Sequence, residues 1–347
     1  MIPEKEIKYI RKRIIESFRP LFFFDDDADG VTSFIQLYKL AGEGKGVCVK
    51  GKPILEESYV RKVEEYSPDL IVILDKPMVS QDFLDKVSQE VIWIDHHPLQ
   101  DNKKVKYFNP RKLDPEDNRP TSYWAYQIAK EDVQNILWIA MIGIVGDWNL
   151  LLADEFRKEY PEFLPENLKT PPDALFNSKV GELVKVITWN LMGTTSDANK
   201  SIKILTRISS PEEILEQTSS QGKFIFRKYQ KMNALYDELI SRLKVPKGKF
   251  LVFKYQDNKF AFSSPLSNEL LYKYPEKIIL VVREKPNEIS ISLRSSKEVI
   301  VDKLKEALKV TTGYGGGHDH ACGASMKRDE FDRFMIEFKK QFKKPKK

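Results

Sequence analysis

All four histidines of this 347-residue chain lie in two short segments. One segment is Asp95-His96-His97, and the other is His318-Asp319-His320, which follows a run of glycines. Histidine changes charge near neutral pH and is a common metal ligand in proteins. A chain that places histidine only in these two segments is expected to use it for chemistry.

A dense acidic cluster follows the apolar run Leu21–Phe24. Four carboxylates within five positions repel one another, and bound cations would relieve that repulsion. Alternation along an extended segment would direct Asp25, Asp27 and Asp29 to one side and Asp26 to the other. We therefore predict that Asp25, Asp27 and Asp29 are metal ligands. The alternative is a solvated acidic turn.

Further aspartates end other apolar segments. Asp75 follows Leu70–Leu74, and Asp95 follows Val91–Ile94. The carboxyl ends of parallel strands meet at one edge of a sheet, so these side chains and the acidic cluster are expected at the same edge. Asp147 ends the apolar helical run 136–146, where a nearby cation would offset its unfavourable position at the helix C-terminus. The alternatives are a helix cap for Asp75 and a solvent-facing helix end for Asp147.

A glycine-rich segment near the C-terminus is a candidate phosphate-binding site. Gly315, Gly316 and Gly317 would allow the backbone to approach a phosphate closely and donate N–H groups to it, and His318 adds a polar donor. Arg294 ends an expected hairpin strand and could donate a two-pronged hydrogen bond to a phosphate. The alternatives are a flexible glycine loop and an exposed arginine.

The pattern of elements predicts an α/β fold. Residues 1–195 alternate β-rich and helical segments, which indicates a parallel sheet with helices on both faces. Residues 196–244 form a helical connector that includes a long amphipathic helix over 224–243. Residues 245–347 form a smaller α+β domain with a hairpin, a glycine loop and a final helix.

Composition limits the class of protein. Hydrophobic residues make up 41% and charged residues 31%, which is typical of a globular chain. The longest uncharged helical stretch, 136–146, is too short to span a bilayer, and the charged N-terminus argues against a signal peptide. Two distant cysteines suggest no disulfide framework. We expect a cytoplasmic protein without a membrane partner, and the net charge of +6 permits a polyanionic partner.

These motifs resemble, in type and order, those of the DHH phosphoesterase family. The matching residues are Asp27-Ala28-Asp29-Gly30, Asp75, Asp95-His96-His97 and Asp147. The segment Gly315–Gly323 resembles the glycine-glycine-glycine-histidine signature of the DHH-associated domain. The resemblance covers nearly the whole chain.

One departure concerns the first motif. Many members of the family carry histidine two or four residues before the first aspartate, where this chain has Asp25 and Phe23. RecJ-type nucleases resemble this chain in having aspartate at the nearer position. The role of Asp25 as a ligand is therefore left open.

The resemblance implies hydrolysis of a phosphodiester by two divalent cations that lie ~3.5–4 Å apart. Manganese is the expected ion, and magnesium is a plausible substitute. Asp75 would bridge the cations, His97 would face the phosphate, and Asp95 would orient the imidazoles. Asp27 would bind one cation, and the other would be bound by Asp29, His96 and Asp147.

The resemblance favours a RecJ-like exonuclease acting on single-stranded DNA or RNA. Two alternatives stay open. One is a nanoRNase-like hydrolase of short oligonucleotides or of linear or cyclic dinucleotides, and the other is a replication-associated scaffold with little activity. A replication or repair protein is a possible partner. Cleavage polarity, sugar preference, substrate length and oligomeric state do not follow from the sequence.

Overall fold

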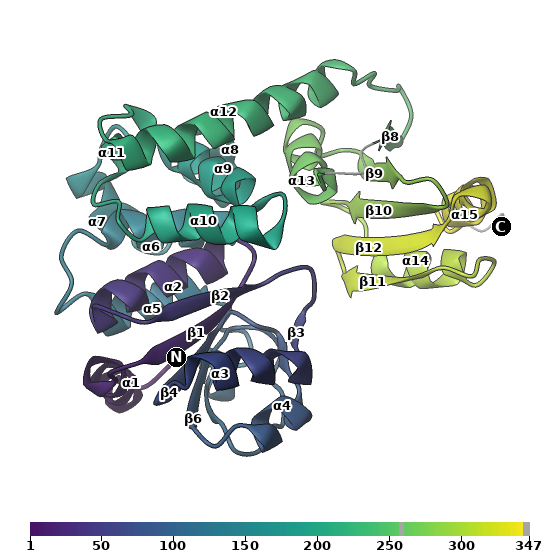
Figure 1. The fold of residues 1–347 in the computed structure, drawn as a ribbon. Helices are drawn as coiled ribbons and strands as arrows, with labels where there is room; N and C mark the ends of the chain where they lie inside the picture. Colours follow the sequence, from purple (N-terminus) through teal and green to yellow (C-terminus); the bar gives the residue numbers. More distant parts are fainter. Residues whose placement is uncertain (257–259, 343–347) are drawn as a thin grey trace. The chain divides into compact units, whose positions relative to one another are not determined.

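The computed structural model describes residues 1–256 and 260–342, and these fall into two compact units divided between Lys231 and Met232 (Figure 1). Helix α12 (Ser220–Ser241) contains the boundary. The last residues of the predicted C-terminal domain, 343–347, lie outside the described residues. Within the described ranges, no helix combines the length and apolar character needed to cross a membrane.

The first unit is built on a parallel five-stranded sheet with the order β2-β1-β4-β6-β7. A two-stranded parallel sheet, β3-β5, accompanies it. This arrangement confirms the predicted fold class. The strands are β1 (Pro20–Asp25), β2 (Lys45–Val49), β3 (Ile54–Leu55), β4 (Leu70–Leu74), β5 (Met78–Val79), β6 (Glu90–Ile94) and β7 (Lys106–Phe108).

The helices of the first unit lie before, between and after these strands in the chain. They are α1 (Glu4–Glu16), α2 (Ala28–Ala41), α3 (Val60–Tyr66), α4 (Gln81–Lys86), α5 (Thr121–Ala129), α6 (Leu137–Gly146), α7 (Ala153–Glu159), α8 (Pro171–Asn177), α9 (Lys179–Leu191), α10 (Thr195–Leu205) and α11 (Pro211–Leu215), with short 3₁₀ turns at Glu57–Tyr59 and Pro110–Lys112.

Burial on both faces explains why the central strands are continuous apolar runs. Phe23 packs in the core cluster that includes Phe83 of α4, whereas Phe22 and Phe24 contact Phe34 of α2. All five residues of β4 are buried. A strand covered by helices on both faces has no polar face, so its sequence shows no alternation.

The parallel arrangement brings the carboxyl ends of β1, β4 and β6 to one edge of the sheet (Figure 1). Asp25 is the last residue of β1, Asp75 follows β4, and Asp95 follows β6. The predicted apposition of these three strand ends is therefore present.

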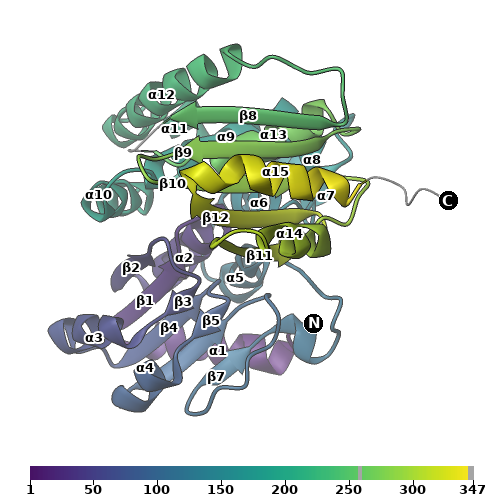
Figure 2. The same cartoon turned by 90° about the vertical axis from the view of Figure 1, so that its right-hand side faces the viewer.

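The second unit contains a five-stranded sheet with the order β11-β12-β10-β9-β8, in which β8 and β9 are parallel and the other pairs antiparallel. Its apolar face forms a core with α14 and α15, and Figure 2 shows α15 lying across that face. The elements are β8 (Phe250–Gln256), α13 (Ser263–Lys273), β9 (Ile278–Glu284), β10 (Glu288–Arg294), α14 (Val301–Leu308), β11 (Tyr314–His318), β12 (Ala321–Lys327), a 3₁₀ turn (Arg328–Glu330) and α15 (Phe331–Lys340).

The glycine segment differs from its prediction. Gly315–Gly317 do not form a loop; they are part of β11, an edge strand paired with β12. A run of glycines has low strand propensity, so its local sequence indicated a loop. Pairing with Ala321–Lys327 of β12 determines its conformation instead.

Candidate metal centre

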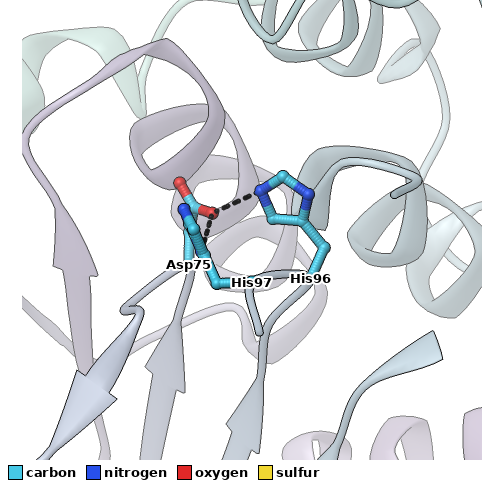
Figure 3. Close-up of side chains that lie close together, drawn as sticks. All are labelled: Asp75, His96 and His97. Atoms are coloured by element: carbon cyan, nitrogen blue, oxygen red, sulfur yellow. Dashed lines mark ion pairs between the residues drawn. The ribbon is translucent and has the colours of Figure 1, made fainter. Parts of the chain in front are cut away.

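Asp75 is the central carboxylate of the site. It is 1% exposed and adopts a left-handed backbone conformation (φ 57°) immediately after β4. Its Oδ1 accepts a hydrogen bond from the Thr121 hydroxyl (3.2 Å) and lies 3.4 Å from Nε2 of His96. Oδ1 also lies 3.9 Å from Nδ1 of His97, and Figure 3 shows both imidazoles beside this carboxylate. The end of the central strand thus meets the histidine pair.

The orientation of His96 suits a neutral metal ligand. Its Nδ1 lies 3.3 Å from the carbonyl oxygen of Asn118, and its Nε2 lies 3.7 Å from Oδ2 of Asp147. An Nδ1–H that donates to a carbonyl leaves the Nε2 lone pair for a metal, which is the usual arrangement of a metal-binding histidine. Burial lowers the pKa of His96 and so favours the neutral ring.

His97 is held by Asp95, which is completely buried. The Asp95 carboxylate accepts hydrogen bonds from Nδ1 (2.7 Å) and from the backbone N–H (3.0 Å) of His97. It also accepts bonds from the Tyr107 hydroxyl and the Asn109 amide. Although burial opposes it, the bond to Asp95 raises the pKa of His97, so the ring holds a proton more readily and its Nε2 can donate.

Asp27 and Asp29 do not lie on one extended segment as predicted. Helix α2 begins at Ala28, and Asp27 caps it by accepting a bond from the backbone N–H of Gly30 (2.9 Å). A side chain on Gly30 would collide with the backbone of Asp25, so glycine is required where the helix starts this close to the strand end. Asp29 points toward the site from the first turn of α2, not by strand alternation.

Asp29 is fixed by the start of another helix. Its two carboxylate oxygens accept the backbone N–H groups of Thr121 (2.7 Å) and Ser122 (2.8 Å), the first residues of α5. A carboxylate is favourable at the positive end of a helix dipole. Asp29 is only 3% exposed, and these two hydrogen bonds compensate the burial of its carboxylate and fix its position.

The carboxylates destabilise one another in the absence of a cation. Burial is the main cause that raises the pKa of Asp75 and of Asp147 well above the usual range of aspartate, and repulsion from Asp29 and Asp27 adds to it. Burial and the charge of Asp29 likewise raise the pKa of Asp27. Divalent cations would relieve this repulsion directly.

The donor set fits a divalent cation. Among the described residues, ligand atoms of Asp29, His96 and Asp147 lie within 4.8 Å of one another, and so do those of Asp75, His96 and His97. Carboxylate oxygens with one or two imidazoles suit manganese and magnesium better than thiolate-preferring metals. Of the seven residues predicted to bind metal or to act in catalysis, the structure thus brings together five, which are Asp29, Asp75, His96, His97 and Asp147. Asp27 lies close enough to Asp75 for its charge to raise the pKa of that carboxyl.

Asp25 is placed differently from the other predicted ligands. Its Oδ1 lies 3.0 Å from Nζ of Lys76 and also accepts the backbone N–H of Asp26. Lys76 is completely buried, and its Nζ also donates to the carbonyl oxygen of Lys52 (2.6 Å). Lys76 was not predicted as a site residue, because lysine side chains are rarely fully buried.

Other residues of the site were also missed. Thr121 and Ser122 act through backbone or hydroxyl groups, and Tyr107 and Asn109 lie on or after the short edge strand β7. The one available signal was the segment Asn109-Pro110, which starts a 3₁₀ turn capped by Asn109. Their distance from the histidines in the sequence does not form a recognisable motif.

The predicted phosphate-binding residues lie together in the second unit. Sheet register places His318, Ala321 and Arg294 in one row across β11, β12 and β10. Arg294 is half-buried and donates to the Asn268 amide oxygen (2.7 Å) and the Ser264 hydroxyl (3.2 Å). Gly316 has open space where a side chain would be, on the same face of the sheet as His318.

Comparison with known families assigns both parts of the chain. Residues 21–144 match the N-terminal domain of the DHH family, and residues 247–344 match the DHHA1 domain. The chain belongs to the DHH phosphoesterase family. It carries a C-terminal DHHA1 domain, as the motifs indicated, and no curated protein sequence is significantly similar to it.

Solved structures share this fold at low sequence identity. RecJ from Thermus thermophilus, in complex with Mn2+, superposes with a TM-score of 0.68 at 16% identity, covering 98% of this chain and 55% of RecJ. The pGpG-specific phosphodiesterase PggH from Vibrio cholerae gives 0.55 at 14% identity, covering 93% and 98%. CDC45 from Entamoeba histolytica gives 0.55 at 12% identity, covering 97% and 98%. This DHH protein thus spans about half the length of the RecJ chain that it resembles.

Proposed function

We propose that this DHH protein is a metal-dependent phosphodiesterase and, more specifically, a RecJ-like exonuclease that hydrolyses single-stranded DNA or RNA from an end. The observation that carries the proposal is the convergence of Asp29, Asp75, His96, His97 and Asp147 at one edge of the parallel sheet. Burying so many carboxylates together is costly unless cations neutralise them.

Two divalent cations would be held by two sets of residues that share Asp75. Asp27 and Asp75 would bind one, and Asp29, His96 and Asp147 would bind the other together with Asp75. Bound cations supply Lewis-acid chemistry, because they lower the pKa of water and stabilise negative charge on a phosphate under attack. Manganese is the proposed ion with magnesium as an alternative, and RecJ from Thermus thermophilus has been solved with each.

His97 would act on the substrate. Since Nδ1 is bonded to Asp95, the ring presents Nε2 away from its anchor. A proton at that nitrogen could be donated to a phosphate oxygen and would stabilise charge as the bond to phosphorus breaks. Asp95, Tyr107 and Asn109 keep the ring in this orientation and need not touch substrate.

The DHHA1 domain would supply a second phosphate contact. His318 and the edge of β11 would bind one phosphate group, and Arg294 would donate to another oxygen. An edge strand directs every second N–H away from its partner strand, which makes these amides available to an anion. Retention of a terminal phosphate would favour cleavage near a strand end.

A nanoRNase-like activity on short oligonucleotides or on linear or cyclic dinucleotides is the second candidate. The observation that favours it is the similarity to PggH along 98% of the PggH chain, since that protein is described as specific for pGpG. A scaffold role, suggested by the likeness to CDC45, is less well supported because the carboxylates and histidines of the site are present and lie close together. A replication or repair partner is compatible with all three.

Manganese-dependent hydrolysis of single-stranded DNA and RNA, from dinucleotides to long strands and labelled at either end, tests the proposal. Progressive shortening of long strands would support the exonuclease and give its polarity. Cleavage confined to the shortest substrates would support the second candidate. Stoichiometric manganese binding without cleavage of any substrate would contradict both.

A further inference from the structure

Lys76 forms an ion pair with Asp25 at the edge of the site and has no role in the proposed chemistry. It follows Asp75 directly, and yet its side chain is completely buried. A buried ammonium group is costly unless it is paired and hydrogen bonded, so the fold must compensate Lys76. Its compensation comes from the carboxylate of Asp25.

The side chain and backbone of Lys76 together contact three other segments of the chain. Nζ lies 3.0 Å from Oδ1 of Asp25 at the end of β1 and 2.6 Å from the carbonyl oxygen of Lys52, which follows β2. The Trp93 indole on β6 donates to the backbone carbonyl of Lys76 (3.0 Å). Both the backbone and the side chain of Lys76 therefore have hydrogen-bond partners within the protein, which replace those that solvent would provide.

This contact changes the ligand set of the site. Oδ1 of Asp25 already accepts two donors, from Lys76 and from the backbone N–H of Asp26. Among the described residues, the groups whose ligand atoms lie close enough to share an ion contain Asp29, Asp75, His96, His97 and Asp147 but neither Asp25 nor Asp27. Of these two, Asp25 is the one paired with Lys76. The lysine also places a fixed positive charge beside the cluster.

We infer that Lys76 is the permanent counter-ion of Asp25 and removes this carboxylate from the metal ligands. It is a positioning residue: it leaves Asp27 and Asp75 to hold one cation and keeps that cation weakly bound. The other cation, with Asp29, Asp75, His96 and Asp147, is bound more tightly. The inference rests on the proposed function only in requiring that the site bind divalent cations.

Neutralising the lysine should tighten metal binding. In Lys76→Met the ammonium group is absent and Asp25 becomes available as a ligand, so we expect the weaker of two manganese affinities to increase at least tenfold. Lys76→Gln removes the charge but keeps a hydrogen-bond donor, and we expect the same direction. The readouts are calorimetric titration with Mn2+ and the spin resonance spectrum of bound Mn2+, both without substrate.

Lys277 provides a matched control in the second unit. It is also buried, and its Nζ donates to the carbonyl oxygens of Pro246 and Gly248 (2.9 Å each). Lys277→Met should lower stability through loss of those bonds and leave manganese affinity unchanged. The double variant Asp25→Asn with Lys76→Met should lose the gain of the single variant, because the released ligand is absent.

Two results would overturn the inference. One is manganese affinity that is unchanged or weaker in both Lys76 variants. The other is failure of both variants to fold even at saturating Mn2+, because a bound cation should neutralise the released Asp25. A wild-type chain that binds no manganese would instead contradict the proposed function, so the two failures are distinguishable.

Discussion

Asp95 shapes the site by holding His97. It is fully buried, and its carboxylate holds the imidazole and the backbone N–H of His97. Tyr107 and Asn109 donate to the same carboxylate and fix its direction. The role predicted for Asp95 was to orient both imidazoles; in the structure it contacts His97, while His96 is oriented by the carbonyl of Asn118.

Asp95→Asn should reduce turnover about 10–100-fold while manganese affinity stays within about twofold of wild type, as expected for a residue that orients a catalytic group. The amide keeps the size of the carboxylate but cannot accept the bond from His97 in the same way. Steady-state kinetics and manganese titration of the same preparation measure both quantities. A parallel loss of metal affinity would show that Asp95 supports the ligands.

Residue type and position after apolar runs drew attention to the charged residues of the site, and the structure places Asp75 and Asp147 beside His96. That these residues bind metal stays a prediction. As members of the site, Asp75, His96 and Asp147 could be predicted in this way. Backbone donors could not be, since every residue has an N–H group and only the fold selects those of Thr121 and Ser122. Lys76 was missed for a related reason: its burial depends on a partner far away in the sequence.

At the scale of elements, two glycines of the edge strand β11 have different structural roles. Gly317 has φ 141°, and an added Cβ would lie 2.4 Å from the carbonyl oxygen of Ala321. Gly316 has no atom within 4 Å of its added Cβ. The first glycine is required by the backbone, whereas the second leaves free space on the face that carries His318.

Gly317→Ala should therefore destabilise the second unit by about 1–3 kcal/mol, and Gly316→Ala should change stability by less than about 0.5 kcal/mol. In Gly316→Ala the new methyl group occupies the open face, so KM should rise with little change in kcat. Chemical denaturation and kinetics test the pair. Equal stability of the two variants would contradict the assigned backbone strain.

An ion-pair cluster joins α1 to the sheet of the first unit. Glu90 at the start of β6 receives bonds from Arg13 (2.9 Å), Lys106 (2.7 Å) and Tyr9. Although burial alone would raise it, these bonds, led by that from Lys106, lower the pKa of Glu90 to about 2. A carboxyl group with a lowered pKa stabilises the fold at pH values above its ordinary pKa.

Glu90→Gln should lower the free energy of unfolding by about 1–2 kcal/mol at neutral pH, an amount reduced for partial solvent screening. The difference from wild type should shrink as the pH falls from the ordinary value of 4.5 toward 2, because the wild-type carboxylate becomes protonated there. Denaturant titrations at several pH values measure it. A difference that does not depend on pH would contradict the ionic origin.

The central strands were predictable because burial on both faces produces continuous apolar runs. The run Leu70–Leu74 coincides with β4. Edge strands β2 and β7 were not predicted, since they are short or glycine-containing and acquire their conformation from a neighbouring strand. The glycine segment was mistaken for a loop for the same reason.

At the scale of the whole molecule, the chain consists of two compact units with separate cores. The carboxylate and histidine cluster lies entirely in the first unit, and the glycine strand lies in the second. Metal should therefore stabilise one unit directly.

Saturating Mn2+ should raise the melting temperature of the first unit, and chelation with EDTA should lower it to the metal-free value. At a free ion concentration ~100 times Kd, the expected stabilisation is about 2.7 kcal/mol. Calorimetry, which can resolve separate transitions, is the measurement. A shift confined to the second unit would place the metal elsewhere.

The central claim is that Asp75 joins two divalent cations in a hydrolytic site. Its most direct test is single-turnover hydrolysis of single-stranded oligonucleotides by wild type and Asp75→Asn at saturating Mn2+, with circular dichroism to verify the fold. We expect the variant to fold like wild type and to lose at least ~1000-fold in rate, because the substitution removes the bridging charge and keeps the size. Turnover by the variant at the wild-type rate would contradict the account.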